Sequence, residues 1–105
     1  MPQIHELTAA EIAHQIRDRT ITPMKVVQAL LARMDALEPQ LEAWVRVDRE
    51  TVLADAQKRQ AEMDIGAETG PLHGVPIAVK DLCFTKGVAT MGGTKALMNH
   101  VPDFD

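Results

Sequence analysis

The first half of the chain carries apolar residues at the three- and four-residue spacing of an amphipathic helix. The clearest run occupies residues 23–37, where the apolar positions share one face (Val26, Val27, Leu30, Leu31, Met34 and Leu37). Start and stop signals predict two further helices, over about residues 9–19 and 49–63, the latter with a thinner apolar face. Pro39 is expected to stop the second helix, because proline cannot donate the hydrogen bond that a helix interior requires.

Each predicted helix is preceded by a side chain that can cap it. Thr8 and Glu11 have the spacing of a capping box. Thr22 stands before Pro23, whose missing N–H does no harm at the first position of a helix, and Asp48 can cap the third helix. Two apolar pairs have the spacing of hydrophobic staples (Leu7 with Ile12, Ile21 with Val26). These signals locate the start of all three helices.

Two later segments have the patterns of β-strands. Apolar and polar residues alternate in LEAWVRV, which predicts a half-buried strand over about residues 41–47. The run VPIAVK is nearly continuous in apolar residues and predicts a short buried strand over about residues 75–80. Glycines and prolines mark the intervening loop, and the chain after residue 82 reads as irregular, with one helical turn at 94–98.

The order of these elements predicts an α/β fold. Two strands cannot cover the apolar faces of three helices and also each other, and a nearly continuous apolar strand is typical of a sheet covered on both faces. No pattern after residue 82 would supply this cover. We therefore expect residues 1–105 to be the front, N-terminal part of a single larger domain.

Composition and charge narrow the classes of function. The formal net charge of −4 argues against direct binding of nucleic acid, which requires a basic surface. No apolar run approaches the roughly 20 residues that span a bilayer, and the N-terminus lacks the features of a signal peptide, so a cytoplasmic location without membrane association is expected. A single cysteine, and histidines without metal-ligand spacing, predict neither a disulfide nor a metal site.

The stretch GPLHGVPIAVKDL raises the question of why a lysine, Lys80, ends an apolar run. Its ammonium group can lie in water or pair with Asp81 or Glu68, which is the ordinary outcome for a lysine at a strand end. The alternative is a buried amine, whose pKa falls because burial disfavours the cation. A neutral amine can accept a proton and is therefore of chemical interest.

Three other functions are compatible with parts of the sequence. Residues 87–94, GVATMGGT, have glycines at the spacing of a phosphate-binding loop but lack its lysine at the required position. Cys83 can be read as a nucleophile with His73 as its base, although the apolar neighbours of Cys83 favour an inert buried thiol. The third is a non-catalytic interaction fragment, since an uncovered apolar face and open strand edges favour association.

The segments GPLHGVPIAVKDL, GVATMGGTKAL and HVPDFD together resemble the N-terminal part of the amidase signature family, whose members hydrolyse or transfer carboxamide C–N bonds. The resemblance implies a mixed β-sheet sandwiched between α-helices, in agreement with the α/β prediction. It also implies that Lys80 is the lysine of a catalytic Ser-Ser-Lys triad, whose two serines follow later in the family's chain. No metal or organic cofactor is implied.

By this resemblance, neutral Lys80 acts through a bridging serine on the serine that attacks the amide carbonyl. Met91, Gly92 and Gly93 either line the substrate site or form a simple tight turn, next to a threonine where serine is more usual in the family. Asp81 either orients Lys80 or caps the turn that follows.

The function expected from the resemblance is that of an amidohydrolase acting on a small-molecule amide. The 105-residue piece is expected to be inactive by itself, because it holds only the lysine of the triad, and to self-associate or be partly disordered over residues 83–105. A homo-oligomer, or the partner subunits of an amidase-like amidotransferase, are the macromolecular partners left open.

Overall fold

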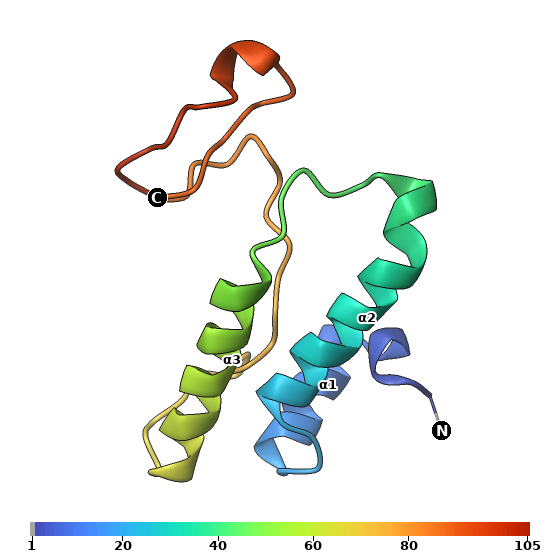
Figure 1. Ribbon diagram of the computed structural model, residues 1–105. Coiled ribbons are helices and arrows are strands. Elements are labelled where there is room, and N and C mark those ends of the chain that lie inside the picture. Colours follow the sequence, from blue (N-terminus) through green and yellow to red (C-terminus); the bar gives the residue numbers. More distant parts are fainter. Residues whose placement is uncertain (1) are drawn as a thin grey trace.

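The computed structural model describes residues 2–105, and this range contains three α-helices (Figure 1). They are α1 (Ala9–Arg17), α2 (Pro23–Leu41) and α3 (Arg49–Asp64). Two short 3-10 helices, η1 (Ile4–Glu6) and η2 (Lys95–Leu97), complete the helical structure. Figure 1 shows α2 and α3 side by side, with the C-terminal residues beyond the ends of both helices.

The predicted helix caps are confirmed. The Thr8 hydroxyl accepts a hydrogen bond from the Glu11 N–H at 3.2 Å, and the Glu11 carboxylate accepts one from the Thr8 N–H at 2.7 Å. The other two caps are side-chain oxygens that accept a backbone N–H from three residues on (Thr22 from Lys25 at 3.1 Å, Asp48 from Thr51 at 3.0 Å). All three helices begin directly after these residues.

The helix ends differ from the predicted ones. α1 stops at Arg17, because Arg19 takes a left-handed backbone conformation (φ 60°) that a right-handed helix does not contain. α2 continues to Leu41, so the prediction that Pro39 stops it was wrong. Pro39 lies in the last turn of α2, where few hydrogen bonds depend on it, and the helix ends instead at the left-handed Glu42 (φ 47°).

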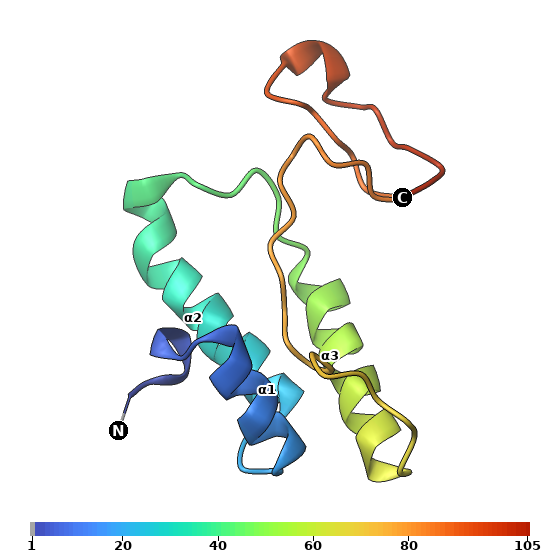
Figure 2. The same ribbon diagram turned by 180° about the vertical axis from the view of Figure 1, so that it is seen from behind.

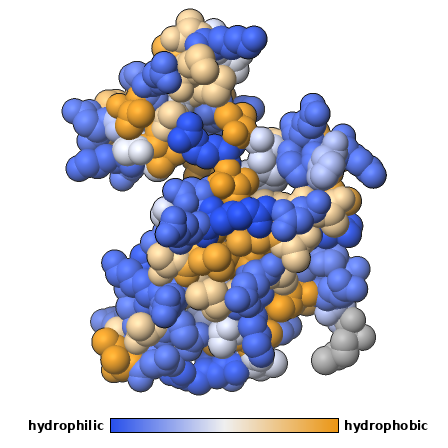
Figure 3. All heavy atoms as spheres, viewed as in Figure 1, coloured by the Kyte–Doolittle hydropathy of each residue, from blue (hydrophilic) through white to orange (hydrophobic). Residues whose placement is uncertain are grey.

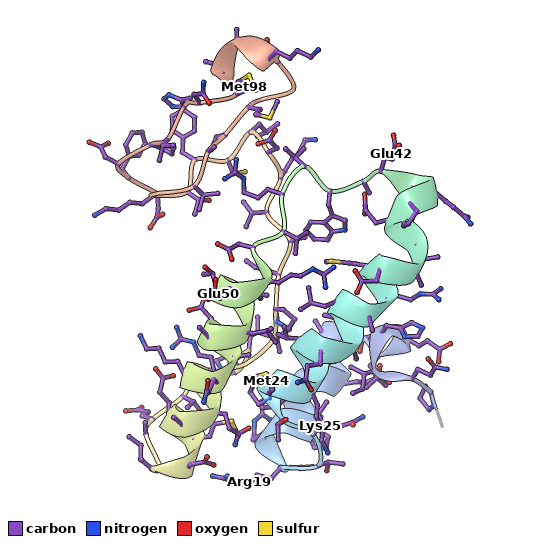
Figure 4. The ribbon with its side chains drawn as sticks, in the orientation of Figure 1. Arg19, Met24, Lys25, Glu42, Glu50 and Met98 are labelled. Carbon is purple, nitrogen blue, oxygen red and sulfur yellow. The ribbon has the colours of Figure 1, made fainter. Side chains whose placement is uncertain are left out.

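Two clusters of apolar side chains hold the helices together. One joins α1 to the start of α2 (Ile12, Ile16 and Val26), and the other lies between α2 and α3 (Val27, Leu31 and Ala56). Arg19, labelled in Figure 4, lies at the turn between α1 and α2. It donates to the Met63 carbonyl at 2.7 Å and pairs with Asp64 at 3.1 Å. The turn is thereby fastened to the end of α3.

Neither predicted strand is present among residues 2–105, and the mixed sheet is not confirmed. Leu41, expected to open the first strand, is the last residue of α2, and residues 42–48 form a loop. Residues 75–80 run as an unpaired segment between the α1–α2 pair and α3 (Figure 2). A strand requires a neighbour that receives its N–H and C=O groups, and the described residues offer none to either segment.

The expected burial of residues 75–80 is likewise absent. Ile77 and Val79 are 81% and 53% exposed. Only the first residue of the segment, Val75, packs against the apolar cluster of α1 and α2. An apolar run becomes buried when other elements cover both of its faces, and residues 2–105 cover only its beginning.

The loop before this segment is held firmly on the helices. His73 Nε2 lies 2.9 Å from the Arg59 carbonyl of α3. Gly74 has a left-handed backbone (φ 83°), and a Cβ atom added there would lie 2.8 Å from Cγ of Pro23 at the start of α2. The direction in which residues 75–80 leave the helices is therefore set at this loop.

Residues 83–105 fold back on themselves. Two backbone hydrogen bonds of 2.9 Å join their outward and returning halves (Gly87 N–H to Pro102, Thr90 N–H to His100). The ring of Phe84 lies between two others, with centroid separations of 5.2 Å to His100 and 5.4 Å to Phe104. The helical turn expected at 94–98 is present as η2.

Candidate active site

Lys80 lies at the outer end of the unpaired segment. Its carbonyl accepts a hydrogen bond from the Cys83 N–H at 2.9 Å, so a tight turn follows it directly. Its side chain is exposed. The sequence leaves open whether the Lys80 amine is exposed or buried. Among residues 2–105 it is exposed, because none of these residues covers the end of the segment.

Lys80 lines a hollow of about 750 Å³. Its walls come from three parts of the chain, within residues 43–48, 77–83 and 85–90. Apolar side chains make up much of the lining, among them Trp44 and Val79. The lysine amine thus stands at the edge of a largely apolar space that is large enough for a small organic molecule.

The charged groups around the hollow are of both signs. Arg46, Asp48 and Asp81 line it together with Lys80. The backbone N–H of Thr51, and then its hydroxyl, hold the pKa of the Asp48 carboxyl below its ordinary value of 3.8. Asp48 is therefore ionised at neutral pH but committed to the cap of α3. Within residues 2–105, Lys80 forms no ion pair with Asp81 or Glu68, the partners considered from the sequence.

A second, apolar groove of about 560 Å³ adjoins this hollow. It lies between α2, the loop 43–48 and residues 76–78, and Trp44 and Ile77 line both spaces. Figure 3 shows apolar surface between α2 and α3 and on the part of the chain beyond them. The surface next to the candidate site is thus largely apolar.

Asp81 joins Lys80 to a segment ten residues further along the chain. Its carboxylate oxygen Oδ1 accepts a hydrogen bond from the Met91 N–H at 3.0 Å. Its main-chain carbonyl accepts one from the Gly92 N–H at 2.7 Å. Because Asp81 directly follows Lys80, these two hydrogen bonds link the predicted catalytic residue to the predicted substrate-lining segment.

Met91, Gly92 and Gly93 form a tight turn. The Met91 carbonyl accepts the Thr94 N–H at 3.2 Å, and both glycines have left-handed backbones, with φ values of 60° and 79°. Such a turn favours glycine at both central positions because a Cβ atom would be strained there. These three residues do not line the hollow beside Lys80. The backbone of this segment is thus a tight turn, and its place at the substrate site stays a prediction.

Cys83 and His73 lie in different surroundings. Cys83 is an exposed free thiol that lines the hollow with Lys80, so the expectation of a buried thiol was wrong. The apolar neighbours of Cys83, Leu82 and Phe84, are themselves exposed and do not cover it. His73 is instead engaged with α3.

Metal-ligand clusters, membrane-spanning helices and serine residues are other features that would bear on function. In residues 2–105, no group of three or more histidine, cysteine, aspartate or glutamate side chains is arranged to hold a metal ion. No helix in the same range is long and apolar enough to cross a membrane. The 105-residue sequence contains no serine.

The contribution of the loop 43–48 to this site is not visible in the sequence. The alternating pattern of residues 41–47 predicts that Trp44 and Arg46 lie in a strand, yet both belong to a loop and line the hollow beside Lys80. Thr90, which is 4% exposed and also lines the hollow, gave no signal at all. The only sequence feature that pointed to the Asp81 contact was the position of an acidic residue directly after Lys80.

The sequence is similar to a protein family and to several known proteins. Residues 25–105 match the Amidase family. The whole chain is 41% identical to a glutamyl-tRNA(Gln) amidotransferase subunit of Streptomyces coelicolor. It is also 40% identical, over 97% of its length, to the putative amidase AmiD of Mycobacterium tuberculosis. The identity to the acylamidase of Rhodococcus erythropolis is 35%, over 93% of the chain.

These similarities cover a limited part of each relative. The matched regions make up 21%, 22% and 20% of the three proteins, respectively. The chain therefore spans about a fifth of the length of the curated relatives that it matches.

Proposed function

The chain belongs to the amidase family, and we propose that it supplies the catalytic lysine, Lys80, of an enzyme that cleaves a carboxamide C–N bond. The observation that carries the proposal is the position of Lys80 at the edge of a largely apolar hollow, at the end of the segment GPLHGVPIAVK. In this proposal, residues 1–105 are the N-terminal part of a single amidase domain, and residues 75–80 become a strand of its mixed sheet.

The proposed chemistry requires the amine of Lys80 to be neutral. An unperturbed lysine has a pKa of about 10.4 and is almost entirely charged at neutral pH, whereas burial disfavours the cation. Since Lys80 is exposed among residues 2–105, the cover must come from other parts of the enzyme. The neutral amine then accepts a proton, through a bridging serine, from the serine that attacks the amide carbonyl.

The acyl-enzyme formed in this attack can be released by water or by a second amine. Ammonia or an amine leaves the amide when the acyl-enzyme forms, and water then releases the acid. The enzyme is an amidohydrolase if that ammonia is a free product, and an amidotransferase if the ammonia, or the acyl group, passes to an acceptor. The similarity to a glutamyl-tRNA(Gln) amidotransferase favours keeping the second outcome, with partner subunits, as the alternative. Because the 105 residues contain no serine, we expect this chain alone to turn over no amide.

The test is amide turnover by the protein encoded by the complete reading frame that carries this sequence. We expect Lys80→Ala and Lys80→Arg to lower kcat at least about 100-fold, because a missing base or a permanently charged one cannot accept the proton. Lys95→Ala removes an exposed lysine of η2 and serves as the matched control, with turnover unchanged. Full turnover by the Lys80→Ala enzyme would exclude the proposal.

The same preparation distinguishes the two reaction classes. Release of free acid and ammonia from simple amides, without any added protein, indicates a hydrolase. Turnover that appears only with partner subunits and an acceptor indicates an amidotransferase.

A further inference from the structure

We propose that Asp81 is a positioning residue, which holds Lys80 in place by fastening its segment to the turn at residues 91–93. This inference rests on the proposed role of Lys80. The contact between Asp81 and Met91 lies entirely within the described residues. Its presence can therefore be tested by a measurement other than activity.

Few other contacts hold Lys80 in place. The segment before it is anchored at its start, where Val75 packs on the helices, but Ile77 and Val79 are exposed and residues 76–80 lie in no strand. The tight turn after Lys80 fixes its carbonyl through the Cys83 N–H. Asp81 therefore supplies the nearest attachment of Lys80 to a part of the chain remote in sequence.

The attachment at Asp81 consists of two hydrogen bonds. Two successive backbone N–H groups, of Met91 and Gly92, donate to two different oxygens of Asp81, at 3.0 Å and 2.7 Å. Two bonds between one residue and a turn restrict rotation as well as translation. A hydrogen bond to a carboxylate is in general stronger than one to a main-chain carbonyl, because a carboxylate carries a negative charge.

The Asp81 carboxylate is not used elsewhere. Asp81 is half-buried, and its side chain forms no ion pair among residues 2–105. Asp105 offers a contrast in the same part of the chain: its Oδ1 accepts the Lys86 N–H at 2.8 Å, at a distance in sequence from Lys80. Both aspartates therefore accept a hydrogen bond from a backbone amide, but only Asp81 is the neighbour of Lys80 in the sequence.

A displacement of a catalytic group by about 1 Å can lower a rate about 100-fold. In the protein encoded by the complete reading frame, we expect Asp81→Ala to lower kcat about 10- to 100-fold with KM changed less than about threefold. Asp81→Asn keeps a side-chain oxygen that can accept the Met91 N–H, so it should recover most of kcat with an unchanged pH profile. Asp105→Ala is the matched control and should leave kcat unchanged.

Amide hydrogen exchange at Met91 gives the readout that does not depend on activity. We expect exchange there to accelerate at least about tenfold in Asp81→Ala, because the carboxylate acceptor is lost, and to change less in Asp81→Asn. Asp105→Ala should accelerate exchange at Lys86 instead. Unchanged exchange at Met91 in Asp81→Ala would overturn the contact itself.

The remaining outcomes are also decisive. Faster exchange at Met91 with an unchanged kcat would overturn the positioning role. An equal loss of kcat in both Asp81 variants, with a shifted pH profile, would mean that Asp81 acts on Lys80 through its charge, which also contradicts the proposal. Full turnover by Lys80→Ala would refute the proposed function itself, and this result is independent of the exchange at Met91.

Discussion

Gly74, in the loop before Lys80, lies close against the start of α2. Its backbone is left-handed (φ 83°), and an added Cβ atom would lie 2.8 Å from Pro23 Cγ and 3.3 Å from Ile16 Cδ1. Both neighbours are buried and cannot move freely. The left-handed backbone and the close approach both require glycine at this position.

We therefore expect Gly74→Ala to lower the free energy of unfolding by about 1–3 kcal/mol, from backbone strain and from the contact with Pro23. Gly70→Ala is the control within the same loop, because a Cβ atom there meets nothing within 4 Å. It should be neutral or slightly stabilising. Denaturant unfolding of both variants measures the difference, and equal stability would show that the close approach is absent in solution.

The glycines near the candidate site, unlike Gly74, have no close neighbour in the described part of the chain. At Gly92 and Gly93 the backbone is left-handed but an added Cβ atom has room, so their requirement for glycine comes from the turn alone. The Lys80 side chain is as exposed as that of an ordinary surface lysine, and the largely apolar hollow that it lines is what sets it apart. Its proposed role depends on the surroundings of the side chain.

At the scale of single elements, the helices are specified by their ends. The Thr8 N–H, and then the Thr8 hydroxyl, lower the pKa of the Glu11 carboxyl below its ordinary value of 4.5, and Thr51 does the same for Asp48 at the start of α3. Both carboxylates are more acidic in the folded chain than in the unfolded one. Their contribution to stability is thus present above the ordinary pKa values and is lost as pH falls through the lowered ones.

This linkage predicts a loss of helix on acidification below about pH 4.5, measurable by circular dichroism. Asp48→Asn should make the loss shallower, because asparagine caps a helix about as well as aspartate but does not titrate. Asp55→Asn is the control, since Asp55 lies inside α3 and has no capping role. Identical acid titrations of the native chain and Asp48→Asn would contradict a role for this carboxylate.

The two predicted strands, unlike the helices, did not form within the residues that the structure describes. The alternating pattern of residues 41–47 and the apolar run of residues 75–80 both satisfied the sequence criteria for strands, yet neither is a strand among residues 2–105. A capped helix satisfies its backbone groups internally, whereas a strand depends on a second strand that its own sequence does not contain.

At the scale of the whole molecule, apolar surface remains uncovered. Several large apolar side chains are more than half exposed, and a number of them lie around the two grooves (Leu41, Val45, Ile77 and Val79). Contiguous apolar patches of this kind favour association with other surfaces. For the isolated 105-residue chain, the most abundant such surface is another copy.

We expect the isolated chain to self-associate, with an apparent mass in sedimentation that rises with concentration. Ile77→Asp should weaken this association, because Ile77 lines both grooves. Ile65→Asp is the matched control: Ile65 is 82% exposed, close to the 81% of Ile77, but lies at the end of α3 and lines neither groove. A monomer at every concentration over a hundredfold range would contradict the expectation.

The sequence by itself determined the three helix starts and the family. Caps and staples act between residues three to five positions apart, so a short stretch contains all the information that they need. The motifs GPLHGVPIAVKDL and GVATMGGTKAL likewise lie in continuous stretches, and the resemblance they carried is confirmed by the match over residues 25–105.

The tertiary structure alone decided what residues 41–47 and 75–80 become, and how Lys80 is held. Each of these depends on contacts between residues far apart in the chain, such as the carboxylate of Asp81 with the amide of Met91. The energy of such contacts is set by the distance and direction between groups in space. A pattern along the sequence records neither, so these features could be known only from the folded chain.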